Sequence, residues 1–272
     1  MSSKISSLKS RVLVAVVGIP LLLWVLLWAD QLVMMAVLCL LAGIGAAELQ
    51  QCVSGGKKGE LAGLSAVAAI MTVEWYFDRP AYVAVLFVFL AVEFFLLAII
   101  KGGEVKFAQI AAGLFGSIAI GYAFSAFLRI HAMGLHRAYL LLPFILSFAC
   151  DTFAYFIGCS IGKHKLAPKV SPKKSVEGAI GGLAGNVLCG VLFAFIMERW
   201  VGVEVGYGAV VVLALACGVV AEIGDLSFSL IKREYGIKDY GKLFFAHGGV
   251  LDRFDSVLFV APMIELILTF VK

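Results

Sequence analysis

The sequence predicts an all-α integral membrane protein with about nine transmembrane helices. The 272-residue chain is 62% hydrophobic, and only 15% of its residues are charged, whereas soluble proteins carry about 25% charged residues. The mean hydropathy is +1.03. Because lipid cannot satisfy the hydrogen bonds of an irregular backbone, apolar segments that cross the membrane are expected to be helices.

Nine segments approach the roughly 20 apolar residues that a spanning helix needs. In chain order they are 12–29, 32–49, 61–77, 81–100, 107–128, 138–158, 178–198, 207–230 and 254–271. The third segment is the weakest, because Glu74 and the string WYFDRP crowd its end. The first is expected to be retained, since Trp28-Ala29-Asp30 does not resemble a signal-peptide cleavage site.

The orientation follows from the basic residues, because cytoplasmic loops are enriched in Lys and Arg. With nine spans, 17 of the 22 basic residues fall on the side of the N-terminus and five on the opposite side. We therefore expect the N-terminus in the cytoplasm and the C-terminus outside. The two longest loops, 159–177 and 231–253, are then both cytoplasmic.

Cysteine and glycine patterns are interpreted as packing features. The six cysteines are scattered and form no CxxC pair, so we expect buried side chains rather than a disulfide framework or a zinc site. The seventh segment has small residues four apart, at Gly178 and Gly182 and at Gly181 and Gly185. This spacing favours close helix packing within the chain, with a dimer contact as the alternative.

Acidic side chains inside apolar segments need a partner, a metal ion or a wet cavity, since each costs about 2.5–3.5 kcal/mol at bilayer depth. Such acids are Glu93, Asp151, Glu222, Asp225 and Glu265. Glu222 and Asp225 are three residues apart near the cytoplasmic end of the eighth segment, so they share one helical face. Glu93 and Glu265 lack neighbouring motifs and are interpreted as structural polar contacts.

The string AHGGVLDRFD closes the second long loop. Gly248 and Gly249 allow close backbone approach and expose amide groups that suit an anion. Asp252 and Asp255 are expected to face one way on a helix that opens the ninth segment. With Asp225 at an equivalent depth, these oxygens suit Mg²⁺ beside a phosphate. The alternative is that the acids only complement the helix dipole.

The first long loop contains SPKKSVEG, just before the seventh segment. Ser171 or Ser175 can cap that helix, with Glu177 in its first turn. A helix N-terminus beside Lys173, Lys174 and hydroxyl groups also suits a phosphate. The alternative is an anchor on anionic lipid headgroups, which we favour for the upstream Lys163, Lys165 and Lys169.

Two basic cytoplasmic loops thus frame carboxylates at the membrane surface, which suits a polyphosphate, a divalent metal and a lipid headgroup. HExxH and Walker A strings are absent, and no nucleophile–base pair is evident. A phosphoryl-type transfer with an anionic nucleophile needs positioning, metal and charge neutralisation instead.

The second loop also has a fixed spacing of charged and glycine residues: Ser229-Leu-Ile-Lys232-Arg233, then Lys238-Asp239-x-Gly241, then His247-Gly248-Gly249-x-x-Asp252-Arg253-x-Asp255. This run resembles the signature of the phosphatidate cytidylyltransferases, or CDP-diacylglycerol synthases. The strings DTFAYFIG and SPKKSVEG resemble other motifs of that family, whose architecture of nine spans and a cytoplasmic site agrees with the segments above. The resemblance runs from Asp151 onward. One departure is Phe245-Ala246, because the family usually has Pro or Gly at the first position.

The resemblance implies that CTP and phosphatidic acid react to CDP-diacylglycerol and pyrophosphate, with Mg²⁺ and a monovalent cation such as K⁺. The lipid phosphate attacks the α-phosphorus of CTP. Asp225 and Asp252 match the metal-binding aspartates, and Asp255 and Asp151 are candidates for supporting metal roles. The groups expected to hold CTP are Ser171, Lys173, Lys174, Ser175, Gly248 and Gly249. Those expected at the lipid phosphate or the pyrophosphate are Lys232, Arg233 and Lys238, with His247 as a further catalytic candidate.

The organisation that follows is a single transmembrane domain over 1–272, with a helical scaffold at 1–137 and a CTP- and lipid-binding catalytic part at 138–272. We expect it in the inner (plasma) membrane with its active site facing the cytoplasm. A homodimer is an open alternative, and no nucleic acid is expected as a partner.

Two other functions are compatible with some of these features. A CTP-dependent polyprenol or lipid kinase shares the CTP and membrane features, but it releases CDP instead of pyrophosphate. An ion-coupled transporter predicts acids towards the bilayer midplane and two repeated halves. Most polar residues here gather at the cytoplasmic ends instead, which disfavours the transporter.

Overall fold

The computed structural model describes residues 16–56, 59–78, 83–243 and 248–271. These residues form two compact units. The first unit combines Met1–Arg137 with Glu234–Phe254, and the second combines Ala138–Arg233 with Asp255–Lys272.

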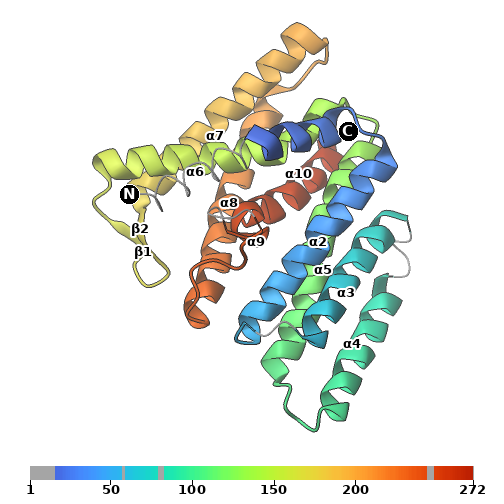
Figure 1. The fold of residues 1–272 in the computed structure, drawn as a ribbon. Coiled ribbons are helices and arrows are strands. Elements are labelled where there is room, and N and C mark those ends of the chain that lie inside the picture. The colour runs from blue at the N-terminus through green and yellow to red at the C-terminus, as the bar shows by residue number, and fades with distance from the viewer. Residues whose placement is uncertain (1–15, 57–58, 79–82, 244–247, 272) are drawn as a thin grey trace. The chain divides into compact units, whose positions relative to one another are not determined.

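The first unit is a helical bundle. Its helices are an apolar helix at Val16–Leu27, α2 (Gln31–Val53), α3 (Glu60–Asp78), α4 (Val83–Ile100), α5 (Phe107–Ala132) and the short α9 (Leu251–Phe254). Helices α2, α3 and α5 pack against one another, and α4 packs on α3 and α5 (Figure 1). Helix α2 begins after Asp30, whose side chain accepts a hydrogen bond from the Leu32 amide at 3.3 Å and so satisfies one of the free N–H groups of the first turn.

The second unit contains four longer helices and a hairpin. Its elements are a 3₁₀ helix η2 (Arg137–Leu141), α6 (Leu142–Ile161), β1 (Lys165–Ala167), β2 (Ser171–Ser175), α7 (Val176–Ile196), a π-helical turn η3 (Met197–Val201), α8 (Tyr207–Glu234) and α10 (Val257–Val271). Strands β1 and β2 pair antiparallel, with Lys165 opposite Ser175 and Ala167 opposite Ser171. This hairpin adds two short strands to the helices, and it forms most of the first long loop.

The glycines of α7 pack against α6. A Cβ atom built on Gly182 would lie 2.9 Å from the carbonyl oxygen of Cys150. The same atom on Gly181 would overlap Ile157, and on Gly185 it would overlap Phe153. The interpretation of the small-residue spacing as close helix packing inside the chain is therefore confirmed.

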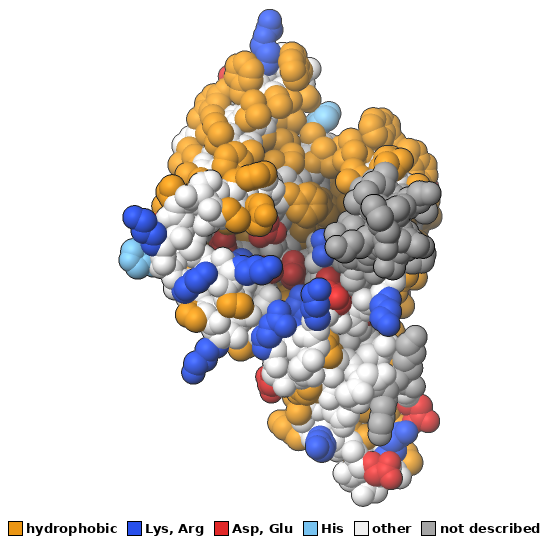
Figure 2. All heavy atoms as spheres, turned by 60° about the vertical axis from the view of Figure 1, so that its left-hand side comes forward, with side chains coloured by type: hydrophobic (Ala, Val, Ile, Leu, Met, Phe, Trp, Pro, Cys, Tyr) orange, Lys and Arg blue, Asp and Glu red, His pale blue; other side chains and the backbone are white. Residues whose placement is uncertain are grey.

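The prediction of an all-α polytopic membrane protein is confirmed. Five described helices are long and apolar enough to cross a membrane: Gln31–Val53, Phe107–Ala132, Arg137–Ile161, Val176–Val201 and Tyr207–Glu234. Shorter apolar helices cover Val16–Leu27, Ala84–Ile100 and Val257–Phe270. Figure 2 shows apolar side chains over large areas of the surface, as expected for helices that face lipid. The count of nine spans and the orientation stay predictions.

The start of the ninth segment differs from the expectation. We expected one helix to carry both Asp252 and Asp255. Instead α9 ends at Phe254, and α10 begins at Val257. The Asp255 carboxylate accepts a hydrogen bond from the Ser256 amide at 2.9 Å, a local bond that competes with the helix. The prediction of a continuous helix here is wrong, because Asp255 lies in a turn.

Candidate active site

A cluster of opposite charges lies in the second unit. Strand β2 carries Lys174, and α8 carries Glu222 and Asp225. The Nζ atom of Lys174 lies 2.6 Å from Oε2 of Glu222 and 2.6 Å from Oδ2 of Asp225. None of the three side chains is more than 24% exposed, so solvent screens these ion pairs weakly. The two carboxylates therefore share one helical face, as their spacing predicts.

The carboxylates around Lys174 stabilise its protonated, positively charged form. Burial alone favours the neutral amine, but the carboxylates of Asp225 and Glu222 outweigh it. The pKa of the Lys174 ammonium is therefore raised above its usual value. Because the ammonium stays protonated, the cluster of one cation and two anions carries one negative charge in excess.

Asp255 extends this cluster in the turn before α10. Burial, together with the neighbouring Asp225 and Asp151, raises the pKa of Asp255 to about 7, although the Ser256 amide and Lys232 act in the opposite direction. Asp225, Asp151 and Asp255 thus influence one another in the second unit. They are three of the four aspartates predicted to bind metal. Asp151 is exposed on α6, and Lys232 is buried on α8.

The donors of this cluster fit a Mg²⁺ ion that is shared with a substrate. Within the described parts of the chain, no three His, Cys, Asp or Glu side chains form a metal cage. Mg²⁺, however, is commonly held by one or two carboxylates together with substrate phosphates and water. Oxygen Oε1 of Glu222 is buried and has no hydrogen-bond partner among the described residues. Glu222 and Asp225, which share the Lys174 ammonium, thus supply hard oxygen donors of the required kind.

Asp252 lies in the first unit and is fixed by the backbone of its own loop. Its Oδ2 atom accepts hydrogen bonds from the amides of Tyr240, at 2.8 Å, and Gly249, at 2.9 Å. Gly248 has a φ of +85°, and a Cβ atom at this position would lie 2.6 Å from Oδ2 of Asp252. Glycine suits this position because it tolerates the positive φ and has no Cβ atom to collide with Asp252. The His-Gly-Gly motif thus positions a carboxylate, while its His247 lies outside the described residues.

The SPKKS string forms β2 and the entry to α7. Ser175 is the N-cap of α7, and its Oγ atom accepts a hydrogen bond from the Gly178 amide at 3.2 Å. Of the two capping candidates, Ser175 is confirmed, whereas Ser171 lies at the start of β2. Glu177 accepts hydrogen bonds from the amides of Lys163 and His164, which fastens the start of the hairpin to the helix. Lys173 is exposed.

The remaining predicted residues lie at the surface. The Nε atom of Arg233 donates to the carbonyl oxygen of Val170 at 3.4 Å, so the end of α8 contacts the hairpin. Lys238 is exposed in the first unit.

Two residues near these groups were missed as site candidates. Glu222 was noticed as an intramembrane acid but was not assigned to the site, although its spacing from Asp225 was the available signal. Glu48 was overlooked, and it accepts hydrogen bonds from the amides of Val250 and Leu251 at 3.1 and 3.0 Å. An acid at the end of an apolar segment was a signal that a partner exists.

A GxSxG string at Gly158–Gly162 was also overlooked in the sequence. Such a string is a nucleophile motif when it connects a strand to a helix. Here it lies at the end of α6, and the hydroxyl of Ser160 donates to the carbonyl oxygen of Phe156 at 2.8 Å. The string is therefore a helix end rather than a nucleophile turn.

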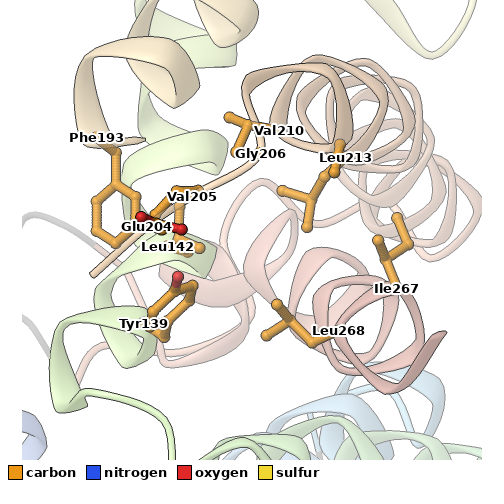
Figure 3. A pocket seen from close by; sticks show the side chains of 11 residues that line it. Tyr139, Leu142, Phe193, Glu204, Val205, Gly206, Val210, Leu213, Ile267 and Leu268 are labelled. Carbon is orange, nitrogen blue, oxygen red and sulfur yellow. The ribbon is translucent and has the colours of Figure 1, made fainter. Parts of the chain in front are cut away.

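A cavity of about 110 Å³ lies elsewhere in the second unit (Figure 3). Its lining includes Tyr139, Phe193, Leu213 and Leu268. Leu213 precedes Asp225 by twelve residues on α8, which is about 18 Å along a helix. The cavity is thus mostly apolar and distant from the charged cluster, so it is not the site of phosphate chemistry.

Comparisons with known proteins agree with this chemistry. The model of the cytidylyltransferase family matches residues 9–271. The chain belongs to this family. A protein of Staphylococcus epidermidis named phosphatidate cytidylyltransferase is 31% identical over 265 residues, which is 96% of this chain and 99% of the relative. A protein of the same name from Staphylococcus haemolyticus is 34% identical over 181 residues, or 66% of this chain and 67% of the relative. The family resemblance inferred from the motifs is therefore confirmed.

Proposed function

We propose that this chain is a phosphatidate cytidylyltransferase: it transfers the cytidylyl group of CTP to phosphatidate, giving CDP-diacylglycerol and pyrophosphate. Membership of the cytidylyltransferase family and the near full-length similarity to relatives of that name support the activity. The structural observation that supports it is the largely buried group of Lys174, Glu222 and Asp225 beside the capped N-terminus of α7. Such a group suits a nucleoside triphosphate and a divalent cation at a membrane surface.

In this reaction a phosphate oxygen of phosphatidate attacks the α-phosphorus of CTP. The bond between the α-phosphorus and the bridging oxygen breaks, and pyrophosphate leaves with the electron pair. The attacking oxygen is already ionised, so the protein needs no general base. Its task is to align the lipid phosphate with the triphosphate of CTP and to neutralise their charge.

The protein's own groups divide this task. Lys173 is exposed and available to the triphosphate, whereas Lys174 orients the carboxylates of Glu222 and Asp225. The lipid phosphate and the departing pyrophosphate are assigned to the basic residues Lys232, Arg233 and Lys238. The resemblance assigns Mg²⁺ to Asp225 and Asp252, with Asp255 and Asp151 in support. When bound, the ion neutralises charge on the phosphate oxygens.

The location is part of the proposal. The asymmetry of Lys and Arg supports a cytoplasmic active site in the plasma membrane. K⁺ beside Mg²⁺ is proposed on the family resemblance. A homodimer stays a proposal, and the α7 glycines that suggested it pack against α6 within the chain.

A product assay tests the reaction. Purified protein in detergent is supplied with CTP, phosphatidate and Mg²⁺, and the nucleotide products are separated. We expect pyrophosphate and CDP-diacylglycerol in equal amounts. Formation of CDP with a phosphorylated lipid alcohol would instead identify a CTP-dependent lipid kinase.

The metal assignment has its own test. Asp225→Asn and Asp252→Asn each remove one anionic oxygen at a proposed ligand, and we expect turnover to fall by at least about 100-fold. Asp30→Asn is the control, because Asp30 only caps α2. Normal Mg²⁺-dependent turnover in either site variant contradicts that ligand.

A further inference from the structure

Glu48 stands out among the buried groups of the first unit. It lies near the end of α2, outside the motifs that the sequence singled out, and its side chain is 6% exposed. A buried carboxylate is costly unless it is hydrogen-bonded or paired. Its partners therefore indicate what it is for.

Both carboxylate oxygens of Glu48 bind the loop that carries Asp252. Oε1 accepts the Val250 amide at 3.1 Å, and Oε2 accepts the Leu251 amide at 3.0 Å. These amides belong to the residues that open α9, where N–H groups have no partner inside the helix. Glu48 thus satisfies them from a helix 200 residues away in sequence.

Two motif glycines make room for this carboxylate. A Cβ atom on Gly241 or on Gly249 would overlap the carboxylate of Glu48. The same Gly249 donates its amide to Asp252. Gly241 and Gly249 therefore lie against the Glu48 carboxylate, while the amides of Tyr240 and Gly249 hold Asp252.

We propose that Glu48 is a positioning residue for the transfer reaction: it fixes the Gly249–Asp252 turn so that the Asp252 carboxylate is held ready for its ligand. The inference rests on the proposed function of Asp252. It assigns to the first helices a direct part in site geometry, beyond that of a membrane scaffold.

The test compares Glu48→Gln with Gln50→Leu. Glutamine keeps the size of Glu48 but offers one acceptor oxygen in place of two, so one of the two amides loses its partner. Gln50 lies on the same helix, is equally buried, and donates to the carbonyl oxygen of Gln109 in α5, so Gln50→Leu perturbs the packing of α2 through a different contact.

We expect Glu48→Gln to lower kcat and to raise the Mg²⁺ concentration needed for half-maximal rate. The product of the two changes should be about 10- to 100-fold, and the KM for phosphatidate should stay unchanged. Gln50→Leu should keep the wild-type Mg²⁺ requirement. If folded Glu48→Gln has the same kcat and the same Mg²⁺ requirement as the wild type, the inference is overturned.

Hydrogen exchange supplies a readout that does not depend on activity. In the metal-free protein, the peptide that contains Val250 and Leu251 should exchange faster in Glu48→Gln than in wild type or Gln50→Leu. Unchanged protection of this peptide also overturns the inference. If wild-type protein lacks the transfer activity, the proposed function fails, and if Asp252→Asn retains it, the assignment of Asp252 as a ligand fails. In both cases the exchange result still decides whether Glu48 holds the turn.

A double-mutant cycle covers the case in which Glu48→Gln does not fold. Gly249→Ala places a methyl group against the Glu48 carboxylate, and Glu48→Ala removes that obstacle. We expect the double variant to lose less unfolding temperature than the two single variants lose when their losses are added. Additive losses contradict the contact.

Discussion

Lys173 and Lys174 are neighbours in the sequence but differ in environment. Lys173 is exposed, whereas Lys174 is mostly buried between Glu222 and Asp225. The sequence indicated a phosphate-binding pair and could not separate the two, because the alternation of side chains along β2 became visible only with the hairpin. The structure therefore assigns them different expected phenotypes.

Lys174→Met should destabilise the protein by about 3 kcal/mol, because it leaves two poorly solvated carboxylates without their cation. Lys173→Met should change the stability by less than about 0.5 kcal/mol and should chiefly raise the CTP concentration for half-maximal rate. Thermal unfolding in detergent and pyrophosphate release against CTP measure the two effects. Equal unfolding temperatures for the two variants would contradict the burial difference.

At the scale of elements, α6 and α7 form a tightly packed pair that depends on glycine. Gly182→Val adds a side chain where even a Cβ atom would lie 2.9 Å from the Cys150 carbonyl oxygen. We expect a loss of at least about 2 kcal/mol, since the backbone of α6 cannot move aside without strain.

Gly63→Ala in α3 is the matched control. A Cβ atom at Gly63 meets nothing within 4 Å, so alanine should stabilise the helix by about 0.5–1 kcal/mol. The thermal unfolding of both variants in the same detergent checks the pair. A neutral Gly182→Val would show that α6 and α7 can separate without cost.

Elements differ in how far the sequence predicted them. Apolar length alone located the long helices, because burial in lipid leaves the backbone no alternative. The β1–β2 hairpin was missed, since a polar loop of 19 residues has no hydrophobic alternation to indicate strands. The break between α9 and α10 was missed too, because the local bond from Ser256 to Asp255 leaves no signal in the apolar pattern.

For the whole molecule, the expected topology is testable by labelling. In a background without the native cysteines, Gly134→Cys should react with a membrane-impermeant maleimide added to intact cells. Lys169→Cys should react only after the membrane is opened. The opposite pattern would place the active-site loops on the outer face and contradict the orientation inferred from Lys and Arg.

The long-range partners of the site were beyond sequence reasoning at this scale. The family motifs predicted Asp225 and Asp252 as metal ligands, because such motifs are read from residues that lie near one another in sequence. Glu48 contacts its loop across 200 residues, and no spacing rule connects positions so far apart. Contacts of this kind arise from the packing of α2 against α9, which only coordinates reveal.

The ion pairs of Lys174 have a consequence for the order of binding. With two carboxylates and one ammonium, the cluster repels a triphosphate and attracts a cation. A divalent cation bound beside these three side chains would reverse the sign of their summed charge. On the proposed function, we therefore expect the ion to arrive before or with CTP.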